Sequence, residues 1–191
     1  MRNNLENKRE LSIASWGIIA PWIKDDVEAK ASQSRAINAR SESIHEKPTF
    51  REAFKTHRCL IPADGYYEWA TELGRFASKQ PFFIHRSDNQ ALAMAGVYEN
   101  GTAAIITKEA TGALAKIHNR MPLFLPKHEW KLWLDSDFND VSELQAILHM
   151  GLSPEDAGLV ADPVSTKVNK IANNGLELTK AIELGEQETL I

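Results

Sequence analysis

Two apolar runs, Arg58–Ala63 and Tyr66–Ala70, flank the dipeptide Asp64-Gly65. Asp-Gly between such runs is a strong signal for a β-hairpin, because both residues tolerate the positive φ of a tight turn. We therefore expect the two runs to pair as antiparallel strands. The longer segment Asn38–Trp69 also gathers arginine, asparagine, glutamate and aromatic side chains. This is more polar chemistry than a hydrophobic core requires.

Other apolar stretches predict further strands. They cover Leu11–Ile19, Pro81–Arg86, Ala91–Tyr98, Thr102–Thr107 and Val160–Ser165. Their alternation between apolar and polar residues is weak. We therefore expect strands that are buried on both faces, or a sheet that curls into a closed form.

Several segments carry helix signals. The pattern Thr49-Phe-Arg-Glu52 predicts a capping box and a short helix over Phe50–Thr56. The pattern Asp140-x-x-Glu143 likewise predicts a helix over Asp140–Met150. Further candidates are Glu109–Ile117, Lys127–Leu134 and, as a loop or short helix, Lys24–Ser34. The predicted fold class is α+β and mostly β, with peripheral helices.

The chain has 191 residues, of which 43% are hydrophobic, and both values fit a single globular domain. We expect this domain over residues 11–182, between a flexible tail at 1–10 and a mobile tail at 183–191. One cysteine excludes an internal disulfide and suits a reducing cytoplasm. No segment approaches the ~18 apolar residues of a membrane span, and the N-terminus lacks the apolar core of a secretory signal. We predict a cytoplasmic protein without a membrane partner.

The charges are distributed unevenly along the chain. The formal net charge is −4, which by itself argues weakly against nucleic acid as a partner. Residues 1–86 contain 14 Lys and Arg against 11 Asp and Glu, whereas residues 87–191 contain 8 against 15. This asymmetry permits a local basic surface. On charge alone, an ordinary solvated surface is the simpler interpretation.

Glu68 is the first candidate for chemistry. Strand alternation places Tyr66 and Glu68 on one face, with Tyr67 and Trp69 on the other. A carboxylate among aromatic rings has its charged form disfavoured, which suits proton transfer near neutral pH. The alternative is a glutamate on a solvated face or one paired with a structural arginine, and position alone favours this alternative.

Two pairs of polar residues share a two-residue spacing. His118 and Arg120 lie on one face of an extended segment and together can handle a proton and an anion. Asn38 and Arg40 repeat the pattern, with a guanidinium that can fork onto a phosphate and an amide that can orient a reacting group. Trp16 can stack on an unpaired base. The competing interpretations are a packed loop histidine and a core tryptophan.

Several site classes find no support in the sequence. The six histidines and the single cysteine show no metal-ligand spacing, and we expect neither metal nor cofactor. No nucleophile elbow, phosphate-cradling glycine loop or HExxH helix is present. Cys59 lies between Arg58 and Leu60 on a predicted strand, so a small buried thiol is the favoured interpretation.

A set of short motifs follows one another in a fixed order along the chain. They are Trp16-Gly-Ile-Ile-Ala-Pro-Trp22, Ile37-Asn-Ala-Arg-Ser-Glu42, Glu46-Lys-Pro-Thr-Phe-Arg-Glu-Ala-Phe54, Arg58-Cys-Leu-Ile-Pro-Ala-Asp-Gly-Tyr-Tyr-Glu-Trp69, Pro81-Phe-Phe-Ile84, Ala95-Gly-Val-Tyr-Glu99, Ile106-Thr107, Ile117-His-Asn-Arg-Met-Pro122 and Pro163-Val-Ser-Thr-Lys-Val-Asn169. The ordered set resembles the SOS-response-associated peptidase (SRAP) family. The resemblance covers about residues 11–180.

The resemblance implies a barrel-like central sheet with a groove for single-stranded DNA that carries abasic sites. In such proteins a cysteine after the start methionine, exposed by self-processing, closes on the sugar aldehyde as a thiazolidine. By position, Asn38 would orient the reacting N-terminus, Glu68 would move protons and His118 would assist opening of the sugar. The resemblance further implies DNA contacts for four residues, namely Trp16, Arg40, Thr107 and Arg120.

The chain departs from the family pattern at its start. Position 2 is Arg2, and 15 residues precede Trp16. We therefore expect an N-terminally shortened member that binds single-stranded DNA in the DNA damage (SOS) response without forming the crosslink. An exposed sheet edge would then permit self-association. The alternatives are a catalytically dead structural remnant, a protein-interaction module or an unrelated hydrolase that uses Glu68 and His118.

Overall fold

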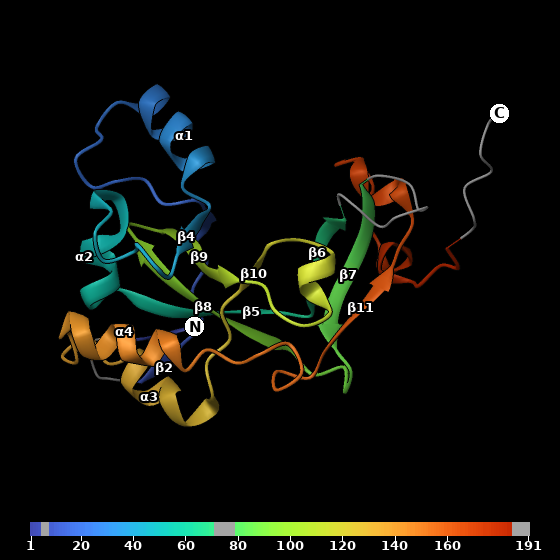
Figure 1. Cartoon of the computed structure of the whole chain (residues 1–191). Helices are drawn as coiled ribbons and strands as arrows, with labels where there is room; N and C mark the ends of the chain where they lie inside the picture. Colours follow the sequence, from blue (N-terminus) through green and yellow to red (C-terminus); the bar gives the residue numbers. More distant parts are fainter. Residues whose placement is uncertain (5–7, 71–78, 185–191) are drawn as a thin grey trace. The chain divides into compact units, whose positions relative to one another are not determined.

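The computed structural model describes residues 1–4, 8–70 and 79–184, and Figure 1 shows the course of the chain. The chain divides into two compact units. Unit 1 comprises Met1–Pro62, Ala93–Lys108 and Pro122–Leu152, and unit 2 comprises Ala63–Leu92, Glu109–Met121 and the chain from Ser153 onward. The single domain expected over residues 11–182 stays a prediction, and residues 185–191 of the expected C-terminal tail lie outside the described residues.

The main sheet contains six strands within the described chain. They are β3 (Ser15–Trp16), β4 (Asn38–Arg40), β5 (Arg58–Ala63), β8 (Leu92–Glu99), β9 (Thr102–Glu109) and β10 (Arg120–Pro122). The order is β10-β9-β8-β5, and β3 and β4 both pair with β9 in parallel. The sheet curls into a half-barrel, which confirms the α+β, mostly-β class and the barrel-like sheet.

β8 and β9 form the tightest hairpin of this sheet. Asn100 and Gly101 join them, with φ of 45° and 76°. Positive φ at both central residues is the signature of a type I′ turn, whose twist matches that of the two strands. Sequence reasoning found both strands but did not recognise this turn.

Helices pack the core of unit 1. They are α1 (Asp26–Arg35), α2 (Pro48–Thr56), α3 (Trp130–Trp133) and α4 (Val141–His149), with a short 3-10 turn η2 (Lys127–Glu129) before α3. Phe54 of α2, Leu144 of α4 and Trp133 of α3 are completely buried against the sheet. As predicted, the Asp140 side chain caps α4, where it accepts hydrogen bonds from the amides of residues 142 and 143. The segment expected as a loop or short helix at Lys24–Ser34 is the helix α1.

Unit 2 contains a separate three-stranded antiparallel sheet. Its order is β11 (Leu159–Pro163), β7 (Gln80–Arg86) and β6 (Gly65–Ala70). The pairing of β6 with β7 runs without interruption from Gly65↔His85 to Ala70↔Gln80. Three 3-10 turns complete the described part of this unit: η1 (Leu114–Lys116), η3 (Thr166–Asn169) and η4 (Leu176–Thr179).

The hairpin expected around Asp64-Gly65 is wrong. β5 belongs to the main sheet, whereas β6 pairs with β7 in the sheet of unit 2. Neither Asp64 nor Gly65 has the positive φ that a two-residue turn needs. Gly65 is required for another reason, because a Cβ there would lie 2.4 Å from the ring of Phe83. The glycine therefore allows β7 to approach β6 closely, as glycine in a strand often does.

Four local expectations also need correction. The strand expected over Leu11–Ile19 is reduced to β3, and Leu11 and Ile13 are exposed. α2 begins at Pro48, so Lys47 rather than Thr49 is the N-cap and the capping box does not form. The helix expected over Glu109–Ile117 is only the turn η1, because β9 continues through residue 109. Within the segment expected as a flexible tail, β1 (Arg2–Asn3) pairs with β2 (Arg9–Glu10).

Within the described ranges, none of the helices is long and apolar enough to cross a membrane.

Arg58 ties the helices of unit 1 to β5. Its side chain is buried and donates to the backbone carbonyls of Trp133 at 2.7 Å and Phe138 at 2.8 Å. It also donates to the carbonyls of Phe54, Lys55 and Asp135. Burial lowers the pKa of Arg58 to about 10, so the guanidinium is still charged at neutral pH.

We expect Arg58→Met to lower the free energy of unfolding by at least ~3 kcal/mol, since several buried carbonyls lose their donor together. Urea unfolding followed by tryptophan fluorescence measures this change. Arg51→Met on α2 is the matched control, because the Arg51 side chain is 53% exposed and its ion pair is with an exposed Glu52 carboxylate. A variant at position 58 as stable as the control would contradict this account.

Candidate functional site

Three of the predicted site residues lie along one edge of β9. β8 pairs with one edge of β9. β3 shares its two β9 partners with β8, and β4 shares Ile105, so β3 and β4 occupy the opposite edge. Trp16 is opposite Ala103, Asn38 is opposite Ile105, and Arg40 is opposite Thr107. Asn38 and Arg40 are exposed while Ala39 between them is buried, as strand alternation requires. The edge therefore presents an indole, an amide and a guanidinium in a row, which we call the edge row (Trp16, Asn38 and Arg40).

Thr107 faces a different environment from the edge row. It is only 9% exposed, although Arg40 is its register partner. Its backbone carbonyl accepts a hydrogen bond from the Ser41 amide at 2.9 Å, which fixes the end of β4 against β9. The structure thus brings Thr107 next to Arg40 but leaves little of its side chain accessible.

The backbone around Trp16 explains why its ring faces solvent. The indole is 60% exposed, and its Nε1 donates to the Ile37 carbonyl at 2.9 Å. Gly17 has a φ of +97°, and a Cβ there would lie 2.2 Å from the Gln33 carbonyl oxygen. Only glycine lets the chain turn so closely under α1. The ring is thus open to solvent, and the interpretation of Trp16 as a core tryptophan is wrong.

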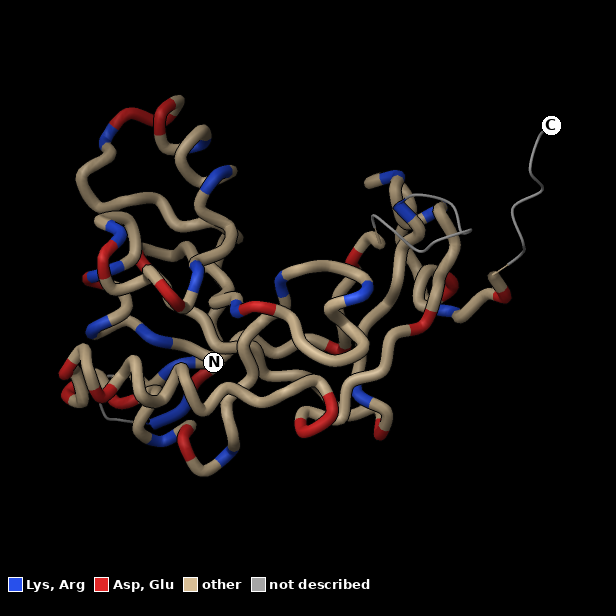
Figure 2. The backbone as a smooth tube through the Cα atoms, viewed as in Figure 1, with Lys and Arg blue, Asp and Glu red and all other residues tan. Residues whose placement is uncertain are grey.

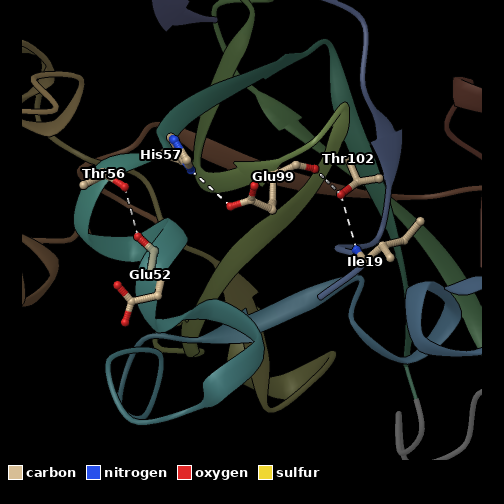
Figure 3. Close-up of polar contacts among 6 residues, drawn as sticks. All are labelled: Ile19, Glu52, Thr56, His57, Glu99 and Thr102. Atoms are coloured by element: carbon tan, nitrogen blue, oxygen red, sulfur yellow. Dashed lines mark hydrogen bonds and ion pairs between the residues drawn. The ribbon is translucent and has the colours of Figure 1, made fainter. Parts of the chain in front are cut away.

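A polar network that sequence reasoning missed anchors the segment after Trp16. The Thr102 hydroxyl donates to the Glu99 carbonyl at 2.6 Å and accepts from the Ile19 amide at 3.3 Å (Figure 3). The Glu99 carboxylate points toward His57 at the C-terminal end of α2, with Oε2 3.1 Å from Nδ1 (Figure 3). Within unit 1, these contacts connect the β8–β9 turn to α2 and to the segment that follows Trp16.

Glu68, His118 and Arg120 form a second group, in unit 2. Glu68 lies on β6, and its Oε1 accepts from the Trp69 amide at 3.1 Å. Its Oε2 lies 3.7 Å from His118 Nδ1, with the two side chains 24% and 37% exposed. The sequence analysis considered Glu68 and His118 separately. The structure places the carboxylate and the imidazole side by side.

The backbone of Arg120 provides hydrogen-bond partners for the His118 imidazole. The Arg120 amide donates to His118 Nδ1 at 3.1 Å. A ring nitrogen that accepts carries no proton, so this hydrogen bond belongs to the neutral tautomer with its proton on Nε2. In the other tautomer Nδ1 donates to the Arg120 carbonyl, 3.2 Å away. When the ring is protonated, Nδ1–H faces the Arg120 carbonyl at 3.2 Å and the Glu68 carboxylate. The imidazole thus has backbone and carboxylate partners on its Nδ1 side.

Tyr66 belongs to the same face of β6 as Glu68. The two residues are two positions apart on a strand that pairs without a bulge. Burial, and then the charge of Glu68, raise the pKa of the Tyr66 phenol. On the opposite face Tyr67 packs against Phe83 with ring centroids 5.3 Å apart, and Trp69 Nε1 donates to Asn169 at 2.7 Å. The predicted division of the strand into two faces is confirmed.

Cys59 is a core residue. It is buried, and burial raises the pKa of its thiol to about 12. The thiolate is the nucleophilic form of cysteine, so this side chain is inert at neutral pH. The interpretation as a small buried thiol is confirmed. Across the residues that the structure describes, acidic, histidine and cysteine side chains form no group that could hold a metal ion.

The sequence and the fold match one family of proteins. The model of the SOS response associated peptidase (SRAP) family matches residues 1–171. The chain belongs to this family. It is 35% identical over 189 residues to the abasic site processing protein YoqW of Bacillus subtilis, covering 94% of this chain and 80% of that protein.

More distant relatives and solved structures agree. The abasic site processing protein HMCES of Gallus gallus is 32% identical over 209 aligned positions, which cover 94% of this chain and 60% of that protein. A crystal structure of a Bacteroides thetaiotaomicron protein superimposes with a TM-score of 0.76 at 28% identity, covering 88% of this chain and 75% of that one. A Bordetella bronchiseptica protein gives a TM-score of 0.70 at 29% identity, with 86% and 82% covered.

We expect Cys59 to resist thiol reagents in the native protein at pH 8, because the thiol is both buried and protonated. Absorbance with an aromatic disulfide reagent should show at least ~100-fold slower labelling than in urea. In urea the same thiol is exposed, so the unfolded chain is the internal control. Rapid labelling of the folded protein would show instead that Cys59 is an accessible nucleophile.

Proposed function

We propose that this chain binds single-stranded DNA that carries abasic sites, as part of the response to DNA damage. The observation that carries the proposal is the match to abasic site processing proteins along 94% of the chain. The edge row supports it, because an exposed indole and an exposed guanidinium are the groups that hold unpaired bases and phosphates.

Each site residue has a role that its surroundings allow. Trp16 stacks on a base, and Arg40 pairs with a phosphate through its guanidinium fork. Asn38, exposed next to Arg40, orients a group of the lesion through its amide. Thr107 and Arg120 contribute to phosphate binding, with Thr107 acting from its mostly buried position beside Arg40.

Glu68 and His118 are assigned to the opened sugar of the abasic site. An aldehyde and its hydrated form exchange protons readily, and a carboxylate beside an imidazole can accept and return them. Oε2 and Nδ1 lie 3.7 Å apart, too far for a hydrogen bond, so neither side chain is committed to the other and each can meet the sugar. These roles concern proton transfer and not covalent capture of the lesion, and Cys59 is buried and takes no part in either.

The charge distribution favours a few specific contacts over a broad basic surface. Basic and acidic side chains are interspersed along α1 and α2 (Figure 2). Such mixed charge gives no large field of one sign to attract DNA at long range. A chain that served only as a structural remnant or a protein-interaction module would show no salt-dependent affinity for single strands, and an unrelated hydrolase would turn over substrates without DNA.

We expect the protein to bind a single strand with one abasic site more tightly than the matched intact strand, as measured by fluorescence anisotropy. Arg40→Ala should weaken binding to both strands. The slope of log K against log salt concentration should fall in magnitude by about 0.7–1, because one phosphate contact is lost.

Arg51→Ala is the control for this experiment, because it removes an exposed positive charge from α2 without touching the edge row. It should leave affinity and salt slope within error of the unchanged protein. Equal affinity for the two strands would refute lesion recognition, and equal salt slopes for all three proteins would remove Arg40 from the DNA contacts.

A further inference from the structure

The Tyr66 hydroxyl is buried and makes no hydrogen bond to any residue that the structure describes. Buried phenol groups nearly always find a partner, and leaving one without costs about 1–3 kcal/mol. Phenylalanine at this position would fill nearly the same volume without that cost. A residue that folding alone does not explain points to a partner that is met during function.

The nearest chemistry to Tyr66 on its own strand is the Glu68 carboxylate. Both side chains project from the same face of β6, because they are two residues apart and β6 pairs with β7 in register throughout. Such neighbours lie about 6.5–7 Å apart along a strand. A tyrosine side chain is long enough to span this distance, and the two groups already interact, since the charge of Glu68 contributes to the raised pKa of the Tyr66 phenol.

Glu68 has an oxygen available for such a bond. Oε1 accepts from the Trp69 amide, whereas Oε2 lies 3.7 Å from His118 Nδ1, too far for a hydrogen bond. His118 Nδ1 itself accepts a hydrogen bond from the Arg120 amide in the tautomer that carries its proton on Nε2. In the described part of the chain Oε2 and the Tyr66 hydroxyl are thus an acceptor and a donor on one face, each without its hydrogen bond.

We propose that Tyr66 is a positioning residue for Glu68: when an abasic strand is bound, Glu68 turns from His118 and Oε2 accepts a hydrogen bond from the Tyr66 hydroxyl. The proposal rests on the proposed function of this same site. No bond is broken in this step, and the proton stays on the phenol.

The exchange of partners has a clear consequence for the site. With the carboxylate held by Tyr66, His118 no longer faces Glu68 and is free to meet the sugar of the lesion. Burial and the charge of Glu68 keep the pKa of Tyr66 high, so the phenol remains a donor at neutral pH. A charge-assisted hydrogen bond of this kind also fixes one orientation of the carboxylate.

Tyr66→Phe tests the proposal, and Tyr67→Phe is the matched control. The control removes the same atom from the adjacent residue of the same strand, on the opposite face, and keeps the ring contact with Phe83. We expect Tyr66→Phe to reduce the preference for abasic over intact single strands about 10-fold, through weaker binding of the abasic strand alone. Tyr67→Phe should leave both affinities unchanged.

Thermal unfolding distinguishes a positioning role from a structural one, because a structural role for the Tyr66 hydroxyl would lower the Tm of Tyr66→Phe. Tyr66→Phe removes a buried group without a partner, so its Tm should be unchanged or higher by about 2–4 °C while binding weakens. In a Glu68→Ala background the same change should have no further effect on binding, because the acceptor of the Tyr66 hydroxyl is already gone.

The outcomes separate this inference from the function on which it rests. A wild-type protein that does not distinguish abasic from intact strands overturns both. If the wild type does distinguish them, the inference alone is overturned when Tyr66→Phe keeps that preference. It is likewise overturned when the loss comes with a lower Tm, or when the losses of Tyr66→Phe and Glu68→Ala simply add.

Discussion

The buried guanidinium of Arg58 is the contact on which unit 1 depends. It reaches carbonyls at the end of α2 and in and after α3, and it stacks over the Trp133 ring at 5.6 Å. Trp133 in turn donates from Nε1 to the Cys59 carbonyl at 2.9 Å, which closes the connection back to β5. Burial disfavours the charge, as the pKa lowered to about 10 shows, and the carbonyl dipoles offset this cost. The helices are therefore locked to the sheet by a polar group inside the core.

A sheet fixed in this way makes the edge row possible. β3 and β4 are very short, and short strands at an edge are stable only when the strand they join is held firmly. β9 provides this support, since most of its side chains are buried and β8 pairs with its other edge. Asn38 and Arg40 gain their exposure from alternation around the buried Ala39. The positions of the edge-row side chains thus depend on the buried core that holds β9.

The sequence predicted much of the fold because strands and helices leave local patterns. The apolar runs located β5–β9 and β11, and the Asp140 cap located α4. The pairing of strands is not local, however. Asp64-Gly65 looked like a hairpin turn, but the glycine serves the contact with Phe83, while the real type I′ turn lies at Asn100-Gly101. The candidate site followed the same division: residue types, spacing and the family resemblance proposed its members, but only the folded chain placed Glu68 beside His118.

Two buried polar groups show how a structural role can be told from a functional one. Arg58 meets backbone acceptors around its guanidinium, so folding itself accounts for its presence. Tyr66 has a hydroxyl that finds no acceptor among the described residues, although Glu68 stands two positions away on the same face. A fully satisfied group stabilises one conformation, whereas an unsatisfied group lowers the energy of a second conformation relative to the first. The site of unit 2 is therefore built for a change of hydrogen-bond partners, and the ligand that drives the change must bind the second arrangement more tightly than the first.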